Sequence, residues 1–301
     1  MDMVRSLSLA FVGLVGAGAV LGQVKKQFTV DNQENCTTVN LSLRAKTGNC
    51  FIRSSQTSEL LNIYSNQDLE EYAHTFSNEV KGAICYVKLA LEQEGGHRGV
   101  SKKISYQVFG GEERGTDKFW KVYLTEGKPY SLNLDYGLGN ANVDLSGLAI
   151  NKLKINTGSA DVNVSYASGI ENKVEMDTFF VKVDLGTLTV KQLNLSRSRV
   201  VMAEVGFGNI FLDFSNTPEV VPTVKGSVGA GNMVILLPAE SVPVMVRISD
   251  SWLCSINLPK SLKKIGGNTF ANEAYSRNSK NALTFDLDVS MGKIIFKEKT
   301  H

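Results

Sequence analysis

Short runs in which apolar and polar residues alternate recur along most of the chain, and most of them follow a turn that contains glycine. The clearest runs place apolar residues at Ala141, Val143 and Leu145, at Ile210, Leu212 and Phe214, and at Met233, Ile235 and Leu237. Val39, Leu41 and Leu43 repeat the pattern in the N-terminal part. A period of two residues is typical of a β-strand that buries one face and exposes the other. The pattern therefore predicts an all-β protein.

Turn and strand repeat together as one unit. GLGNANVDLS at 137–146 matches GFGNIFLDFS at 206–215, and GAGNMVILL at 229–237 continues the series. Because so short a strand cannot bury its apolar face alone, successive units must stack on one another. We predict a single-stranded β-solenoid, or stacked-strand roll, with repeats of about 20 residues. A β-sandwich is the alternative, since it also has short strands at regular spacing.

Overlaying neighbouring units predicts which residues lie above one another in the stack. TGSADVNVS, laid on the first unit, pairs Val162 with Val143, and a further step pairs Val183 with Val162. Near the C-terminus, SMGKIIFKE places Gly292 over Gly208.

The recurring GxGN sequence resembles the start of a dinucleotide-binding G-x-G-x-x-G motif. No copy has the third glycine, and each copy precedes a strand pattern instead of a helix whose N-terminus could hold a pyrophosphate. We therefore expect these glycines to form turns with positive φ between successive strands.

Residues 1–22 have the features of a secretory signal peptide. Arg5 precedes an apolar stretch from Leu7 to Leu21, and the small residues Val20 and Gly22 precede a cleavage point before Gln23. A transmembrane anchor is the alternative, but the stretch is shorter than the roughly 20 apolar residues that a spanning helix needs. We expect no transmembrane segment in the mature chain.

The remainder divides into two parts. A β-rich N-terminal segment is expected over 23–128, and the repeat domain over 129–301, with a soft boundary at Gly127–Pro129. Within the first part, NQDLEEYAHTF at 66–76 has the cap residues of a short helix. Glycine-rich charged stretches at 95–103 and 110–118 are expected to be loops.

Four cysteines in an exported chain suggest disulfides. Cys50 and Cys85 lie at apolar positions of their strands, and a Cys50–Cys85 bridge competes with pairings that use Cys36. Laying INLP at 256–259 on ILLP at 235–238 places Cys254 with Met233, so we expect Cys254 in the core.

Composition narrows the function without naming it. The chain has 301 residues, 43% hydrophobic and 21% charged, with a net charge of +2. That composition is typical of a globular protein. So balanced a charge argues against nucleic acid as a partner, because its binders usually carry a basic face. The basic run KSLKK at 260–264 is interpreted as a solvated surface.

The sequence contains no recognisable catalytic motif. Its three histidines, His74, His97 and His301, stand in no hydrolase or zinc-enzyme pattern. Asp144 and Asp213 occupy equivalent positions in their units, with Asn163 at that position in between, and could form the acid pair of a carbohydrate-active β-helix. Turn or surface roles are the simpler interpretation, so we expect no enzyme and assign no catalytic, cofactor-binding or metal-ligating residue.

The stretch from 130 to 166 is similar to the bacterial toast-rack group, which includes exported candidate adhesins and LiaF-like cell-envelope stress proteins. Gly139, Leu148, Leu153, Ile155 and Gly158 carry the similarity, which extends over 130–296 and more loosely over 30–92. The resemblance implies a β-helical fold and a non-enzymatic envelope or surface role. A signal peptide in place of transmembrane helices favours the adhesin branch.

From these features we expect an exported protein of the bacterial periplasm or cell surface that acts as an adhesin or binding scaffold. Its partner would be an envelope or surface component, and self-association is a further expectation. A carbohydrate-active β-helix enzyme and a structural subunit of a surface assembly are the alternatives.

Overall fold

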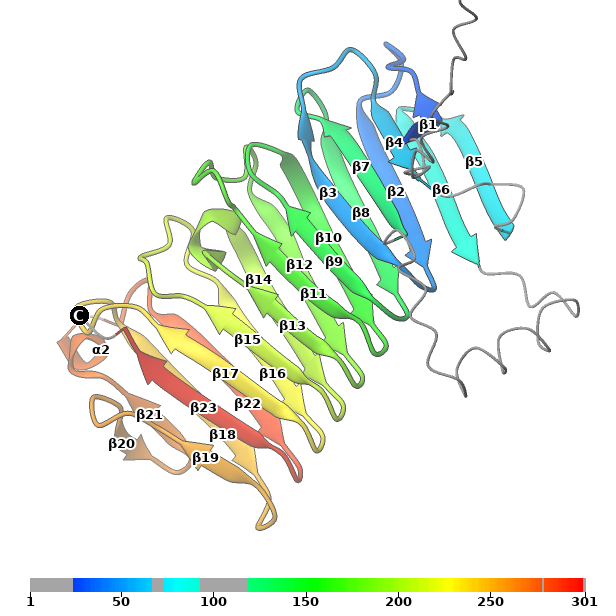
Figure 1. Ribbon diagram of the computed structural model, residues 1–301. Helices are drawn as coiled ribbons and strands as arrows, with labels where there is room; N and C mark the ends of the chain where they lie inside the picture. The colour runs from blue at the N-terminus through cyan, green and yellow to red at the C-terminus, as the bar shows by residue number, and fades with distance from the viewer. Residues whose placement is uncertain (1–23, 67–72, 93–117, 278, 300–301) are drawn as a thin grey trace, which may run out of the picture.

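The computed structural model describes residues 24–66, 73–92, 118–277 and 279–299, and within them nearly every element is a strand (Figure 1). The strands form two long sheets, one of 11 strands (sheet A) and one of 12 (sheet B). The predicted signal peptide lies outside the described residues, as does most of both expected loops. The predictions of an all-β fold and of a solenoid of stacked strands are confirmed.

In the centre of the molecule the chain alternates between the two sheets, with one strand of sheet B, a tight turn, and one strand of sheet A in each coil. The five consecutive coils are β8 (Pro129–Tyr136) with β9 (Asn140–Asp144), β10 (Ala149–Thr157) with β11 (Asp161–Ser165), β12 (Met176–Val183) with β13 (Thr187–Val190), β14 (Ser198–Val205) with β15 (Asn209–Asp213), and β16 (Thr223–Val228) with β17 (Asn232–Leu237). Neighbouring coils pair in parallel. A 3₁₀ turn, η1 (Leu193–Ser196), lies in one of the links that return to sheet B.

At both ends the order of coils in space departs from the order in sequence. The coil of β2 (Thr38–Ala45) and β3 (Asn49–Ser55) lies between the coil of β8 and β9 and that of β6 (Ile84–Glu92) and β7 (Phe119–Thr125). At the other end, the coil of β22 (Leu283–Val289) and β23 (Lys293–Glu298) fills the position between β16/β17 and the coil of β18 (Val244–Asp250) and β19 (Ser255–Asn257). The chain thus leaves a gap in the stack and later returns to fill it.

Antiparallel strands cover three of the four sheet ends. In sheet A, β4 (Leu61–Ser65) pairs with β7, and β1 (Lys25–Val30) pairs with β4. In sheet B, β5 (Ala73–Lys81) covers β6, and the hairpin of β20 (Lys263–Gly266) and β21 (Thr269–Ala271) covers β18. The short helix α2 (Glu273–Arg277) follows β21, and no helix in the described ranges is long and apolar enough to cross a lipid bilayer.

The short helix expected at 66–76 is wrong where the structure describes it. Residues from Ala73 onward form β5, in which His74 pairs with Leu91 of β6. Phe76 is half-buried, and its ring stacks on that of Phe28 with centroids 4.8 Å apart. Pairing with β6 and this contact outweigh the local helix-cap signals, a common outcome for weak propensities.

The core is a set of apolar columns that run between the sheets along the stack. One column consists of Cys50, Ala141, Val162, Leu188, Ile210, Met233 and Ile294, each paired in register with the next and all buried. Since each short strand supplies only two or three such residues, the burial depends on stacking.

Part of the predicted register between units is wrong. Val143 pairs with Val164, and Val162 pairs with Leu188, whereas Val183 belongs to β12 in the other sheet. Strand side chains repeat every two residues, so a slip of two keeps the same faces inward and the hydrophobic pattern cannot detect it. The alignment of the 206–215 and 229–237 units is confirmed, because Asn209 pairs with Asn232.

Glycines occupy one corner of the solenoid because successive turns approach closely there. A Cβ on Gly208 would lie 2.3 Å from the carbonyl oxygen of Gly186, and one on Gly231 would lie 2.1 Å from that of Gly208. Gly292 lies over Gly231 in the same way, which confirms its place in this column. The expected positive φ is found at Gly139 but not at Gly208, Gly231 or Gly292, where the prediction was wrong. There, steric contact between backbones excludes any side chain.

Replacing Gly231 with alanine should lower the free energy of unfolding by about 2 kcal/mol, because the new methyl group would overlap a backbone oxygen that cannot move freely. Gly266→Ala is the matched control, since a Cβ at Gly266 meets nothing within 4 Å. Urea unfolding followed by circular dichroism measures both. Equal stability of the two variants would contradict the steric explanation.

Candidate functional site

The two aspartates considered as an acid pair both hold turns. Asp144 Oδ1 accepts hydrogen bonds from Ser146 N (3.0 Å), from Ser146 Oγ (2.6 Å) and from Ala167 N in the next coil (3.1 Å). Asp213 Oδ1 accepts one from Ser215 N (2.9 Å). Both side chains therefore close the turn where the chain leaves sheet A.

The structure does not bring these two carboxylates together. Asp144 ends β9 and Asp213 ends β15, with β11 and β13 between them. Strands lie about 4.8 Å apart, so the two side chains are roughly 14 Å apart. Paired glycosidase carboxylates are about 5–9.5 Å apart. The position assigned to Asn163 was also wrong, because Asn163 pairs with Asn142 and Ser165 occupies the level of Asp144.

The other polar residues selected from the sequence lie apart from one another. Lys263 and Lys264 are exposed on β20, the edge strand of sheet B, and Lys260 is exposed in the preceding turn. His74 is exposed on β5, while His97 and His301 lie outside the described residues. In the described part of the chain no group of three or more histidine, cysteine, aspartate or glutamate side chains could hold a metal ion.

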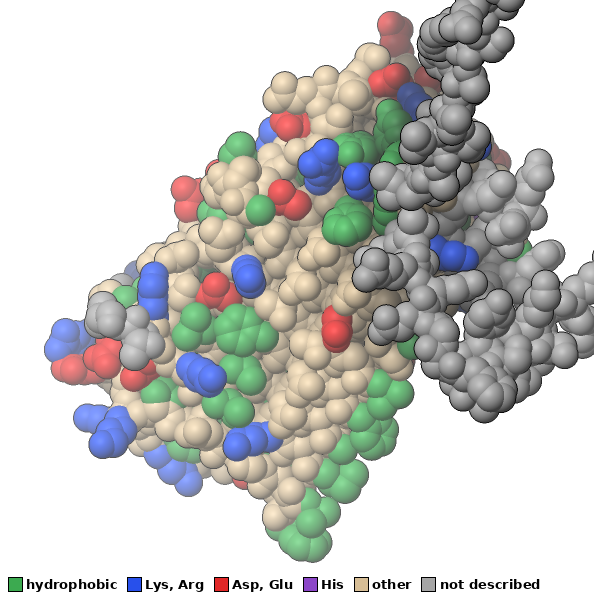
Figure 2. Space-filling model, viewed as in Figure 1, with side chains coloured by type: hydrophobic (Ala, Val, Ile, Leu, Met, Phe, Trp, Pro, Cys, Tyr) green, Lys and Arg blue, Asp and Glu red, His purple; other side chains and the backbone are tan. Residues whose placement is uncertain are grey.

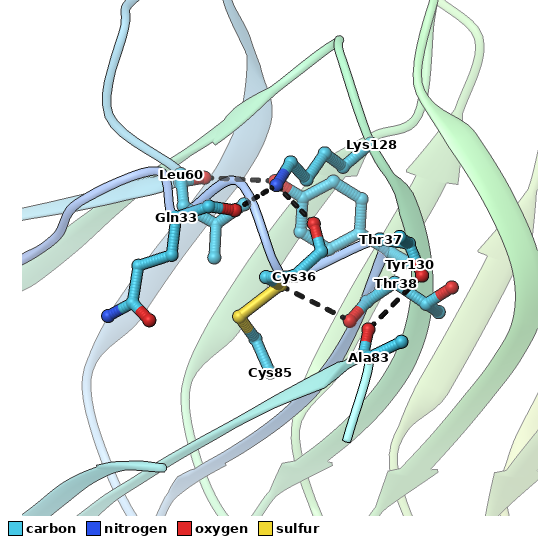
Figure 3. The surroundings of a disulfide bond; sticks show 9 residues. All are labelled: Gln33, Cys36, Thr37, Thr38, Leu60, Ala83, Cys85, Lys128 and Tyr130. Atoms are coloured by element: carbon cyan, nitrogen blue, oxygen red, sulfur yellow. Dashed lines mark hydrogen bonds between the residues drawn. A yellow bond between two sulfur atoms is a disulfide. The ribbon is translucent and has the colours of Figure 1, made fainter. Parts of the chain in front are cut away.

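Cys36 and Cys85 form a disulfide, which decides between the pairings left open by the sequence (Figure 3). Cys36 lies in the loop before β2, and Cys85 lies on β6, the neighbour of β2 in sheet B. The Lys128 ammonium donates hydrogen bonds to the carbonyl oxygens of Gln33 (2.7 Å) and Cys36 in the same loop (Figure 3). The disulfide and the lysine thus attach this loop to two different coils.

Neither remaining cysteine is bonded to another. Cys50 is buried, and burial raises the pKa of its thiol to about 12, which keeps the thiol protonated and unreactive. Cys254 is only half-buried in the turn before β19, so its expected core position was wrong. In the stack it is Ile256, not Cys254, that lies level with Met233, because both pair with Ile294.

A groove of about 420 Å³ crosses the exposed face of sheet B over β14, β16, β22 and β18. Gly226 and Ser227 form its low centre, and Lys225 lies beside them. An ion pair between Arg247 Nη1 and Asp286 Oδ1, 2.8 Å apart, borders it. The charged groups of this groove come from the alternating positions that the strand pattern leaves outward, and Met202, Ala203 and Leu287 add apolar surface to its lining.

Exposed apolar side chains gather along the glycine corner, which sequence analysis missed. The residues are Leu138, Leu185, Phe207, Met291, Trp252 and Leu253, here named the apolar edge, and their exposed fractions range from 49% at Leu253 to 90% at Trp252. Figure 2 shows hydrophobic side chains in a line along the lower right margin of the molecule. The available signal was the middle residue of the G-x-G turns, which applies to Leu138 and Phe207 but not to the other four residues of the edge.

Comparison with known proteins places the chain among others of similar sequence or fold. Residues 21–186 match the family model described as the N-terminal domain of toast_rack, DUF2154. A search of curated proteins finds no match. Among solved structures, the chain aligns with a candidate cell adhesion protein from Clostridium sporogenes at 15% identity and a TM-score of 0.42, covering 92% of this chain and 100% of that one. It also aligns with a candidate adhesin from Bacteroides fragilis at 12% identity and a TM-score of 0.35, covering 91% and 97%.

Proposed function

Because the chain belongs to the family defined by the N-terminal domain of toast_rack, we propose that it is an exported, non-catalytic binding scaffold of the cell envelope or cell surface. Its partner in this proposal is an envelope or surface component.

The disulfide is the observation that carries the exported location. Disulfides persist in oxidising compartments and are rare where cellular thiols are kept reduced. Cys36 and Cys85 are each 1% exposed, and their bond joins two coils at one end of the stack. This supports the interpretation of residues 1–22 as a signal peptide that takes the chain out of the cytoplasm.

The scaffold role is supported by the two sheets. Parallel stacking of coils gives a long body with a fixed spacing of side chains on each outer face. The groove on sheet B and the apolar edge each extend over several neighbouring coils. Such surfaces are suited to contact with an extended partner.

The alternatives fit less well. A carbohydrate-active enzyme needs an acid pair, but Asp144 and Asp213 are far apart and are engaged in turns. An assembly built by end-to-end stacking would pair the outermost strands of the sheets, which in the described part of the chain are β1, β19, β20 and β5. Of these, β19 and β20 have only 3 and 4 residues. Short edge strands are one way in which proteins avoid pairing with further chains.

Thiol trapping in cells tests the proposal. Cells expressing the full chain are quenched with acid, and the unfolded protein is alkylated with a reagent that adds mass to each free thiol. Without a reductant we expect only Cys50 and Cys254 to react, and all 4 cysteines to react after reduction. A chain lacking residues 2–22 should stay in the cytoplasm with all of its thiols free.

Fractionation with an antibody to the mature chain completes the experiment. The full chain should be found with the envelope or outside the cell, and the chain without the leader in the cytosol. Four free thiols in the full chain, together with a cytosolic location, would contradict the proposal.

A further inference from the structure

We propose that the apolar edge inserts into the surface of a lipid bilayer, so that the solenoid rests on a membrane along one corner. This inference rests on the proposed function, in which the envelope supplies the partner, and it names that partner as a lipid surface. Four observations support it: the exposure of the edge, its shape, its backbone hydrogen bonds and its charge.

The side chains of the apolar edge are unusually exposed for their size. Trp252 is 90% exposed, Phe207 71% and Leu185 63%. Single exposed apolar residues are ordinary, but a contiguous row of them marks an interaction surface. The positions between them in the row are Ser159 and Ala230, which are small and uncharged. The row is therefore free of charge from Leu138 to Trp252.

The edge is convex and straight. Its residues occupy the tips of the tight turns between the sheets, one turn for each coil, with neighbouring coils about 4.8 Å apart. A fluid bilayer can accommodate a convex line, whereas a protein partner would need a matching groove. A second copy would meet it along one narrow line of about six residues, and stable dimers usually need about 20–30 residues on each side.

The backbone at the tips is already hydrogen-bonded, which lowers the cost of leaving water. At four tips of the apolar edge the amide donates to a carbonyl oxygen of the neighbouring coil, as in Phe207 N to Asp184 O (2.7 Å) and Met291 N to Gly229 O (2.8 Å). Leu138 and Leu185 donate in the same way, each at 2.8 Å. Unpaired amides would cost several kcal/mol each in hydrocarbon, so this pairing matters more for lipid than for an aqueous partner.

Charged residues lie on the strand ends next to the apolar edge, here called its shoulders, where they would limit the depth of insertion. On the sheet B side, Arg44 pairs with Asp135 at 3.2 Å and Lys182 with Glu204 at 3.9 Å. Asp184, beside the tip, is exposed. The shoulders therefore have no basic excess that would attract anionic lipids, and we expect binding driven by apolar side chains and insensitive to salt. Tryptophan and phenylalanine are suited to such shallow insertion.

The test uses the full chain as purified from the envelope and vesicles of phosphatidylcholine. Binding is measured by sedimentation with vesicles, at low salt and in 0.5 M sodium chloride. The double variant Phe207→Ser, Trp252→Ser should bind at least tenfold more weakly, since it removes the two largest apolar side chains that would leave water on insertion. Phe51→Ser, Ile170→Ser is the matched control, because these residues are 38% and 55% exposed and lie on β3 and in the link after β11, outside the apolar edge. The control should bind within twofold of the unaltered chain, and salt should change binding by less than twofold.

Fluorescence reports on the edge itself. The chain has 2 tryptophans, of which Trp120 is fully buried and Trp252 is on the edge. Brominated phosphatidylcholine should quench Trp252 on binding, because the indole would then lie beside the lipid chains. Trp120 provides a constant background.

Three results would overturn the inference. The first is vesicle binding without quenching of Trp252, and the second is an equal loss of binding in the control variant. The third is a lipid-free oligomer, seen by light scattering, that the Phe207→Ser, Trp252→Ser variant converts to a monomer, because that would assign the edge to self-association. None of these results bears on export, which the thiol-trapping experiment decides separately.

Discussion

Replacing Asn172 with alanine is expected to lower the free energy of unfolding by about 3–5 kcal/mol, although the side chain is polar and contacts no ligand. Asn172 is fully buried in the link between β11 and β12. Its Nδ2 donates to the carbonyl oxygens of Ile150 and Val174, and its Oδ1 accepts from Ile150 N, all at 2.7 Å. Alanine would leave three buried backbone groups without partners, each at a cost of about 1–3 kcal/mol.

Asn163→Ala is the matched control for this variant. Asn163 lies on the exposed face of β11, so its loss should change stability by no more than about 0.5 kcal/mol. Urea unfolding of both variants and of the unaltered chain gives the comparison. If Asn172→Ala lowered the free energy of unfolding by less than 1 kcal/mol, water would be replacing the amide, and the link between β11 and β12 would be open to solvent.

Removing the disulfide by Cys36→Ala, Cys85→Ala is expected to cost about 4 kcal/mol, the loop-closure entropy for cysteines 49 residues apart. The effect should be concentrated at the N-terminal end of the stack, because in a repeat fold each coil contacts only its neighbours. Hydrogen exchange should therefore rise first in β2 and β6, while β14 to β17 remain protected.

Reductant supplies the control for the disulfide variant. Reduction of the unaltered chain should reproduce the loss of stability, and reduction of the Cys36→Ala, Cys85→Ala variant should have no further effect. Cys254→Ala should respond to reductant as the unaltered chain does, since Cys254 is a free thiol. An unchanged melting temperature on reduction would show that the bond does not form in solution.

Several features of the fold follow from the sequence because they depend on local periodicity. Alternation at Val39, Leu41 and Leu43 is enough to predict β2, and the GxGN turns are enough to predict stacking. The predicted match between the repeat unit of Asn140 and that of Asn209 is confirmed, because each residue is the first of a strand in sheet A. Periodicity therefore predicts the elements and their inward faces.

The features that could not be predicted depend on which segments are neighbours in space. The displaced coils β2/β3 and β22/β23 have the same local pattern as the others, so nothing in them indicates their place in the stack. The choice of Cys85 as partner of Cys36 depends on that displacement, because it makes β6 the neighbour of β2. The apolar edge was missed for another reason: only Leu138 and Phe207 lie between two glycines, and the turns that carry the other edge residues share no such motif.

The displaced C-terminal coil has a consequence for how the chain can be completed. Synthesis proceeds from the N-terminus, so β18 and β19 are made before β22 and β23. In the sheets, however, β22 separates β18 from β16, and β23 separates β19 from β17. Until β22 and β23 are made, the outer edges of β16 and β17 are unpaired and β18 and β19 lack the parallel strands with which they pair. The coil of β22 and β23 therefore completes the stack. A chain cut short before it would lose more than one coil, because β16 and β17 would keep an open edge and β18 and β19 would have no parallel partner.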